Sequence, residues 1–92
     1  MESEHLRTAI NQHVFAKFPG LANKVWRDDE SMDVEFINSC GHLSGKQQML
    51  CKVAYSLWHR EGLVSLNEVV SQLDEENLSN LCAAIKYLQS ID

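Results

Sequence analysis

The fold of this chain is decided by residues 62–78, which read GLVSLNEVVSQLDEENL. Gly62 predicts the end of one helix, because glycine is the residue that most easily leaves the helical backbone conformation. Ser65 and Glu68 have the spacing of a capping box, in which two side chains bind backbone N–H groups that would otherwise lack a partner at a helix start. The stretch therefore predicts a short helix, over about 65–73, that connects two longer helices.

Longer helices are expected on both sides of this short helix. Ser44-Gly45-Lys46-Gln47 fits a second capping box and opens a helix over about 44–60. Asp74 is the expected cap of the last helix, over about 74–90, in a turn where the helix dipole favours negative charge. The apolar residues that we expect to be buried in the short and last helices are Leu66, Val69, Val70, Leu73, Leu78, Leu81, Cys82, Ile85 and Leu88.

The first part of the chain predicts one more helix. Apolar residues from Leu6 to Phe18 recur at three- and four-residue steps with polar residues between them, which is the pattern of an amphipathic helix. We expect this helix to span about 4–17 and to end at Pro19-Gly20, because proline cannot continue a helix.

A β-hairpin is expected after the first helix. Residues 24–27, which read KVWR, precede the polar stretch 28–31, which reads DDES. Met32, Val34 and Phe36 then alternate with acidic residues, and a period of two is typical of a half-buried strand. Because a lone hairpin is marginal in water, it must pack against the helices through its apolar side chains.

Together these patterns predict an α+β fold that is mainly α, with about four helices and a small β-hairpin between the first helix and the second. The three helices from residue 44 to residue 90 resemble a helix-turn-helix in their spacing. At 92 residues, with 45% apolar and 23% charged, the chain has the length and composition of a single folded domain, 1–92. A core of this size gives modest stability, so formation of a homodimer is one way to bury more surface.

Charge and cysteine content bear on partners and on location. Eight Lys and Arg against thirteen Asp and Glu give a net charge of −5, which disfavours binding to the phosphates of nucleic acids. The acidic start of the chain does not fit a secretory signal, and no apolar run approaches the roughly 18 residues of a membrane span. Three cysteines in such a chain are expected to stay reduced. These features predict a cytoplasmic protein whose partner is another protein.

The best candidate for a binding site is the acidic stretch around the predicted hairpin loop. A protruding acidic loop on a rigid support could dock on a basic surface of a partner, speed the encounter and set the orientation. A solvated polar turn would give the same pattern, so the stretch by itself leaves both interpretations open. The five carboxylates are Asp28, Asp29, Glu30, Asp33 and Glu35. A weaker set of candidate contacts on the expected outer faces of the helices is Tyr55, Glu75, Glu76 and Tyr87.

The sequence therefore predicts a small acidic, non-enzymatic interaction module. By analogy alone, inhibitors and accessory proteins of bacteria and phages, such as anti-CRISPR-type inhibitors, cover basic surfaces in this way. An alternative is a helix-turn-helix-like transcriptional regulator, although residues 65–92 hold five acids against one base, which phosphates would repel.

A second alternative is an enzyme that depends on Cys40, whose thiol lies two positions from His42. The sequence predicts no third group that would orient this pair, so no catalytic residue is assigned. A zinc site is disfavoured because Cys51 and His59, eight residues apart on one helix, are separated by about 12 Å of rise. No metal or other cofactor is expected.

Overall fold

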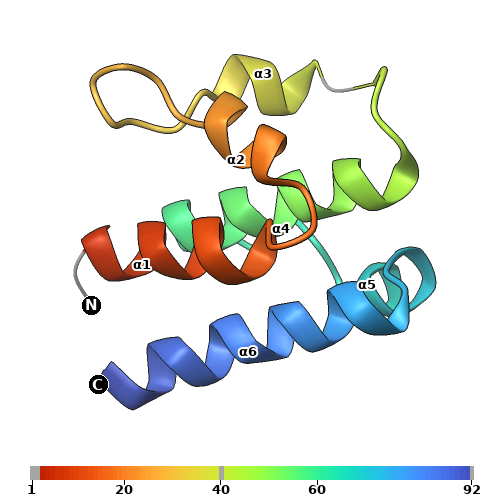
Figure 1. The fold of residues 1–92 in the computed structure, drawn as a ribbon. Helices are drawn as coiled ribbons and strands as arrows, with labels where there is room; N and C mark the ends of the chain where they lie inside the picture. The colour runs from red at the N-terminus through yellow and green to blue at the C-terminus, as the bar shows by residue number, and fades with distance from the viewer. Residues whose placement is uncertain (1–2, 40, 92) are drawn as a thin grey trace.

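Helices make up the regular structure of the residues that the computed structural model describes, 3–39 and 41–91 (Figure 1). The all-α fold of these residues confirms the mainly helical prediction and shows that the β part of it was wrong. In chain order the elements are α1 (Ser3–Ala9), the π-helical turn η1 (Ile10–Val14), α2 (Pro19–Lys24), α3 (Val34–Asn38), α4 (Gly45–His59), α5 (Leu66–Gln72) and α6 (Glu75–Ile91).

The first helical segment is shorter than the predicted 4–17 because its last turn widens. The N–H of Phe15 donates to the carbonyl of Ile10 at 3.0 Å, five residues back, and this π-type bond ends the segment at Val14. Pro19 then begins α2, where the first helical position needs no N–H donor. The first helix thus ends before Pro19-Gly20, as predicted, but a separate short helix, which was not predicted, starts there.

The predicted hairpin is absent from the described residues, where an isolated antiparallel bridge joins Trp26 to Met32. The segment that was expected to form the second strand, around Val34 and Phe36, is the helix α3. Asp33 Oδ1 accepts a hydrogen bond from the N–H of Phe36 at 3.0 Å, so this carboxylate caps a helix start. A capped helix forms here instead of the strand that the alternating pattern predicted, because a pair of strands alone gives little stability.

The predicted caps of the three later helices are confirmed. Reciprocal side-chain and backbone bonds join Ser44 to Gln47 at the start of α4, at 3.3 and 3.1 Å. The same pair of bonds joins Ser65 to Glu68 at the start of α5, at 3.2 Å each. At the start of α6, Asp74 Oδ1 accepts from the N–H of Asn77 at 2.9 Å.

α4 ends at His59, in agreement with the predicted span of about 44–60, but the residue at which the chain leaves the helix differs from the prediction. Arg60, rather than Gly62, leaves the helix, and it does so in the left-handed conformation with φ of 57°. The chain then turns back so that the N–H of Leu63 donates to Ser56 Oγ at 3.1 Å. A side chain of α4 thus fixes the turn that leads to α5.

The helices pack around α4 and the first helical segment. In Figure 1, α6 runs beside α1, and its main contacts are with α1 and η1, whereas α4 packs against α1, η1, α3 and α5. The last three helices therefore do not form the separate trihelical unit that their spacing predicted, because the last helix is bound mainly to the N-terminal part. The largest fully buried apolar side chains are Phe15, Ile10, Leu50, Val14 and Val25.

Several apolar residues of α5 and α6 that were expected in the core are exposed. Val69 and Leu73 cover the α4 side of α5, but Leu66 is 84% and Val70 71% exposed. On α6 the buried side belongs to Leu81, Ala84 and Leu88, while Cys82 is exposed and Ile85 is 45% exposed. The apolar residues of each helix cover more of its circumference than the side that packs against a neighbouring helix. The apolar residues outside that side are therefore exposed to solvent.

Candidate interaction surface

The acidic loop, residues 28–33 between α2 and α3, protrudes from the helices at the upper left of Figure 1. Its backbone closes on itself: the N–H of Arg27 donates to the carbonyl of Ser31 at 2.8 Å, and the N–H of Glu30 donates to that of Arg27 at 2.9 Å. Glu30 has a left-handed backbone with φ of 69°. At the base of the loop, the N–H of Asp33 donates to the carbonyl of Val25 at 2.7 Å. The loop is therefore a tight turn with a defined backbone.

Side chains from distant parts of the sequence hold this loop in place. The guanidinium of Arg7 lies 4.1 Å from the ring centre of Trp26 and 5.3 Å from that of Trp58, and it donates to the carbonyl of Glu30. Trp26 Nε1 donates to Asn11 Oδ1 at 2.6 Å. The two tryptophan rings meet edge to face with centres 4.7 Å apart. Contacts from α1, η1 and α4 thus fix the loop.

Two of the five predicted carboxylates serve the loop itself. Asp29 Oδ1 accepts from the hydroxyl of Ser31 at 2.6 Å and from its N–H at 3.0 Å, and both bonds lower the pKa of the Asp29 carboxyl. Asp33 caps α3 and also lies 3.6 Å from the Arg27 guanidinium. These two side chains shape the backbone and are only in part available to a partner.

The other three carboxylates are exposed and are not used to hold the loop together. Asp28, Glu30 and Glu35 are exposed, and their side chains make no hydrogen bond or ion pair with another described residue. Arg7 and Arg27, the two arginines that contact this region, are already bound within the molecule. Asp28 and Glu30 in the loop, and Glu35 in the first turn of α3, thus carry charges that no described side chain pairs with directly.

The weaker candidates belong to α4 and α6, outside the acidic loop itself. The hydroxyl of Tyr55 donates to Glu61 at 3.3 Å, and partial desolvation followed by this neighbouring charge raises the pKa of Tyr55. Tyr87 packs beside the His13 ring, with centres 5.6 Å apart. Glu75 and Glu76 lie at the start of α6, across the molecule from the loop in Figure 1. None of these four residues makes a hydrogen bond, ion pair or ring contact with the described residues of the loop.

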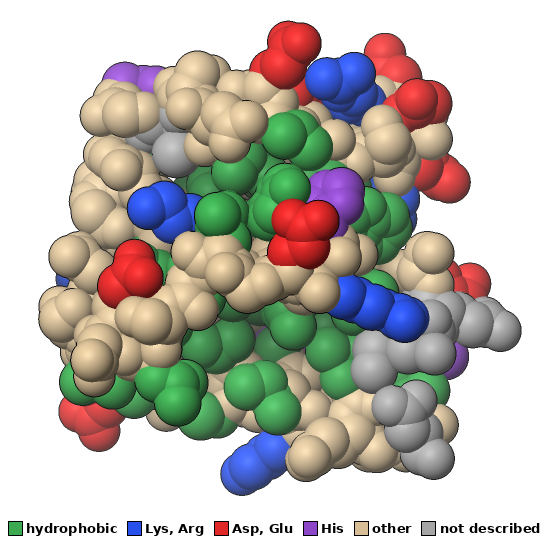
Figure 2. Space-filling view, turned by 180° about the vertical axis from the view of Figure 1, so that it is seen from behind, with side chains coloured by type: hydrophobic (Ala, Val, Ile, Leu, Met, Phe, Trp, Pro, Cys, Tyr) green, Lys and Arg blue, Asp and Glu red, His purple; other side chains and the backbone are tan. Residues whose placement is uncertain are grey.

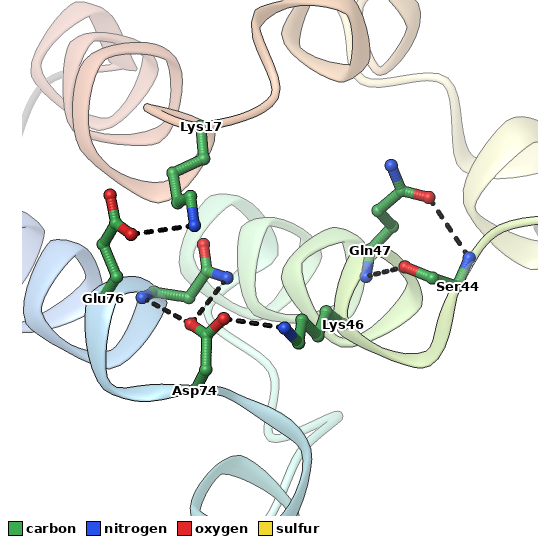
Figure 3. Close-up of polar contacts among 7 residues, drawn as sticks. Lys17, Ser44, Lys46, Gln47, Asp74 and Glu76 are labelled. Atoms are coloured by element: carbon green, nitrogen blue, oxygen red, sulfur yellow. Dashed lines mark hydrogen bonds and ion pairs between the residues drawn. The ribbon is translucent and has the colours of Figure 1, made fainter.

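A cluster of ion pairs at the start of α6, which the sequence did not predict, takes up two acidic residues (Figure 3). Lys46 Nζ lies 2.7 Å from Asp74 Oδ2, and Lys17 Nζ lies 2.9 Å from Glu76 Oε2. The hydrogen bond from Lys46, together with the N–H of Asn77, lowers the pKa of Asp74 to about 2. Hydrogen bonding to Glu76 raises the pKa of Lys17. The cluster joins the starts of α4 and α6 to the chain before α2, which is a structural role.

A small cavity lies between α4 and α5, with a volume of about 200 Å³. Its lining contains one cation, one carboxylate, two amides and the side chain of Met49. It contains no nucleophile and no acid–base pair. Its lining residues are Gly45, Gln48, Met49, Lys52, Glu68 and Gln72. This arrangement does not define a catalytic site.

The remaining predictions concern the Cys40–His42 pair, metal binding and membranes. Cys40 lies outside the described residues, and His42 is exposed with its ring 6.4 Å from that of Phe36. Across residues 3–39 and 41–91, no three or more His, Cys, Asp or Glu side chains are placed so that they could hold a metal ion. Among the same residues, no helix has the length and apolar character needed to cross a bilayer.

No protein-family model matches this chain, and no solved structure matches its fold.

Proposed function

We propose that this protein is a non-enzymatic interaction module that docks on a basic surface of a partner protein through the acidic loop. In this role it would cover that surface, as an inhibitor or accessory protein does. The observation that carries the proposal is the combination of a fixed loop backbone with exposed, unpaired carboxylates at Asp28 and Glu30 in the loop and at Glu35 directly after it.

The fixed backbone matters because association has an entropic cost. A loop that is already ordered by Arg7, Trp26 and Asn11 loses little conformational freedom when a partner binds. A turn that only connects two helices would not need an arginine stacked on two aromatic rings for its support. The support favours a binding role over that of a solvated connector.

The charge of the loop matters for the rate and orientation of binding. Unpaired carboxylates within a short segment attract a basic surface over roughly the Debye length. They also set the direction from which the partner approaches. The net charge of −5 adds to this attraction from farther away. We therefore expect the association rate to depend strongly on salt.

The test replaces the three unpaired carboxylates by their amides: Asp28→Asn, Glu30→Gln and Glu35→Gln in one chain. Asp29 and Asp33 stay, because they shape the loop. With a partner obtained by affinity capture, the association rate should fall by about tenfold at low ionic strength, and its salt dependence should weaken. In the unchanged chain, an oligolysine peptide titrated into isotope-labelled protein should shift the amide resonances of residues 28–35 more than those of other residues.

The matched control removes three charges elsewhere, with Glu2→Gln, Glu4→Gln and Glu61→Gln, none of which belongs to the acidic loop or to the weaker candidate contacts. Its net charge equals that of the loop variant, so a general charge effect would slow both proteins equally. Equal association rates for the loop variant and the unchanged chain would refute docking through the acidic loop.

A further inference from the structure

The outer face of α5 is the most exposed apolar surface among the described residues. Leu66 and Val70, four positions apart, lie one turn from each other on the same side of the helix, and they are 84% and 71% exposed. Leu63, just before the helix, is 44% exposed. In Figure 2, which shows the molecule from behind, hydrophobic side chains are visible along its lower part, where α5 and α6 lie.

This face is not needed to hold α5 in place. Val69 and Leu73, both 7% exposed, form the side that packs against α4. The capping box of Ser65 and Glu68 fixes the start of the helix. Leu66 and Val70 therefore add little to the core of one chain, and neighbouring exposed apolar side chains can form a contact surface.

Charge indicates which partner this face suits. From Gly62 to Leu73 the sequence holds one charged residue, Glu68, and its carboxylate accepts the N–H of Ser65 at 3.2 Å. A chain with a net charge of −5 repels its own copies over most of its surface, but this segment is nearly neutral. A basic partner, in contrast, would find little charge here to bind.

We infer that α5 is the contact surface of a homodimer, in which a second copy of this chain covers Leu66 and Val70. In a two-fold contact the same patch meets itself, so a neutral apolar patch satisfies both copies without like-charge repulsion. Two turns of helix span only about 10 Å, so the contact is small and the dimer should exchange reversibly with the monomer.

The dimer would leave the acidic loops free. The acidic loop and α5 lie at opposite corners of the molecule in Figure 1. A dimer through α5 thus presents two loops at its far ends, and a partner with repeated basic surfaces would be bound more tightly by both.

Sedimentation velocity over a dilution series tests this inference directly. The unchanged chain should shift from monomer to dimer as its concentration rises, and Leu66→Glu and Val70→Lys should each weaken dimerisation by at least about tenfold. Both changes suit the helix, since an acid at its start and a base near its end fit the helix dipole. Circular dichroism of each variant should therefore stay unchanged.

The matched control is Ile85→Glu, which places the same charge at an exposed apolar position of α6 and should leave dimerisation unchanged. An unchanged chain that stays monomeric at every concentration overturns the inference. A dimer that Leu66→Glu does not weaken also overturns it. The same holds if monomers of this chain use Leu66 and Val70 to bind a different protein. Association measured with the loop-amide variant separates this result from the proposed function, because that variant should still dimerise.

Discussion

The acidic loop and α5 are both exposed, yet they are held in place by different means. The loop presents carboxylates, and residues far away in the sequence support it: Arg7 and Asn11 reach across to Glu30 and Trp26. α5 presents apolar side chains, and its start is fixed by its own residues, Ser65 and Glu68.

The difference shows what each kind of surface requires. A charged loop is soluble in any conformation, so a defined shape must come from contacts with the rest of the fold, and ordering it costs backbone entropy. A helix presents side chains in fixed directions as soon as its first turn is capped. Loss of distant contacts should therefore disturb the loop, while α5 should respond mainly to changes on the side that faces α4.

Trp26→Ala would break the support of the loop, and we expect it to have the largest effect. It removes the ring contacts with Trp58 and Arg7 and the hydrogen bond to Asn11. The free energy of unfolding should fall by about 3 to 5 kcal/mol, as measured by urea unfolding followed by circular dichroism. A fall below about 1 kcal/mol would mean that backbone hydrogen bonds alone hold the loop.

A pair of substitutions separates the two sides of α5. Leu73→Ala should lower the free energy of unfolding by about 2 to 5 kcal/mol, because Leu73 is 7% exposed. Leu66→Ala should change it by less than about 0.5 kcal/mol, because Leu66 is 84% exposed. Both are measured at high dilution, where the proposed dimer would be dissociated. Similar losses for the two variants would show that both sides of the helix are buried.

The smallest effect concerns acid at the junction between α5 and α6. The pKa of Asp74 is lowered from its ordinary value of 3.8 to about 2, so the unfolded chain binds this proton at a higher pH than the folded chain does. The stabilisation is therefore complete above the unfolded pKa and is lost as the pH falls from about 4 to about 2.

Asp74→Asn keeps a good helix cap but removes the ion pair with Lys46. Urea unfolding at a series of pH values should show a flatter profile between pH 4 and 2 for this variant. A profile with the same slope in both proteins would assign the acid sensitivity to other carboxylates.

Local signals explain which parts of the fold the sequence predicted. Ser44, Ser65 and Asp74 each cap a helix through a residue three positions away, so the spacing alone identifies the start. Asp33 has the same role, but its cap was hidden by the alternation of Met32, Val34 and Phe36. Where a helix pattern and a strand pattern overlap, the packing of the whole chain determines which structure forms. This packing cannot be read from a short stretch of sequence.

Contacts between distant residues explain what the sequence did not predict. The acidic residues of the loop are visible in the sequence, but nothing there joins Arg7 to Trp26, nineteen positions later. Helical spacing likewise places Leu66 and Val69 in one apolar pattern without indicating that only Val69 faces α4. The location of the candidate site was thus predictable from composition, whereas its support and its unpaired carboxylates were not.

The edge-to-face pair of Trp26 and Trp58 has a spectroscopic consequence. These are the two tryptophans of the chain, and Trp26 lies at the base of the acidic loop. Intrinsic tryptophan fluorescence therefore reports almost entirely on one end of the molecule. A partner that docks on the acidic loop should change the emission, whereas pairing of two chains through α5 should leave it unchanged. The protein thus carries a built-in optical probe that tells the two kinds of association apart without a label.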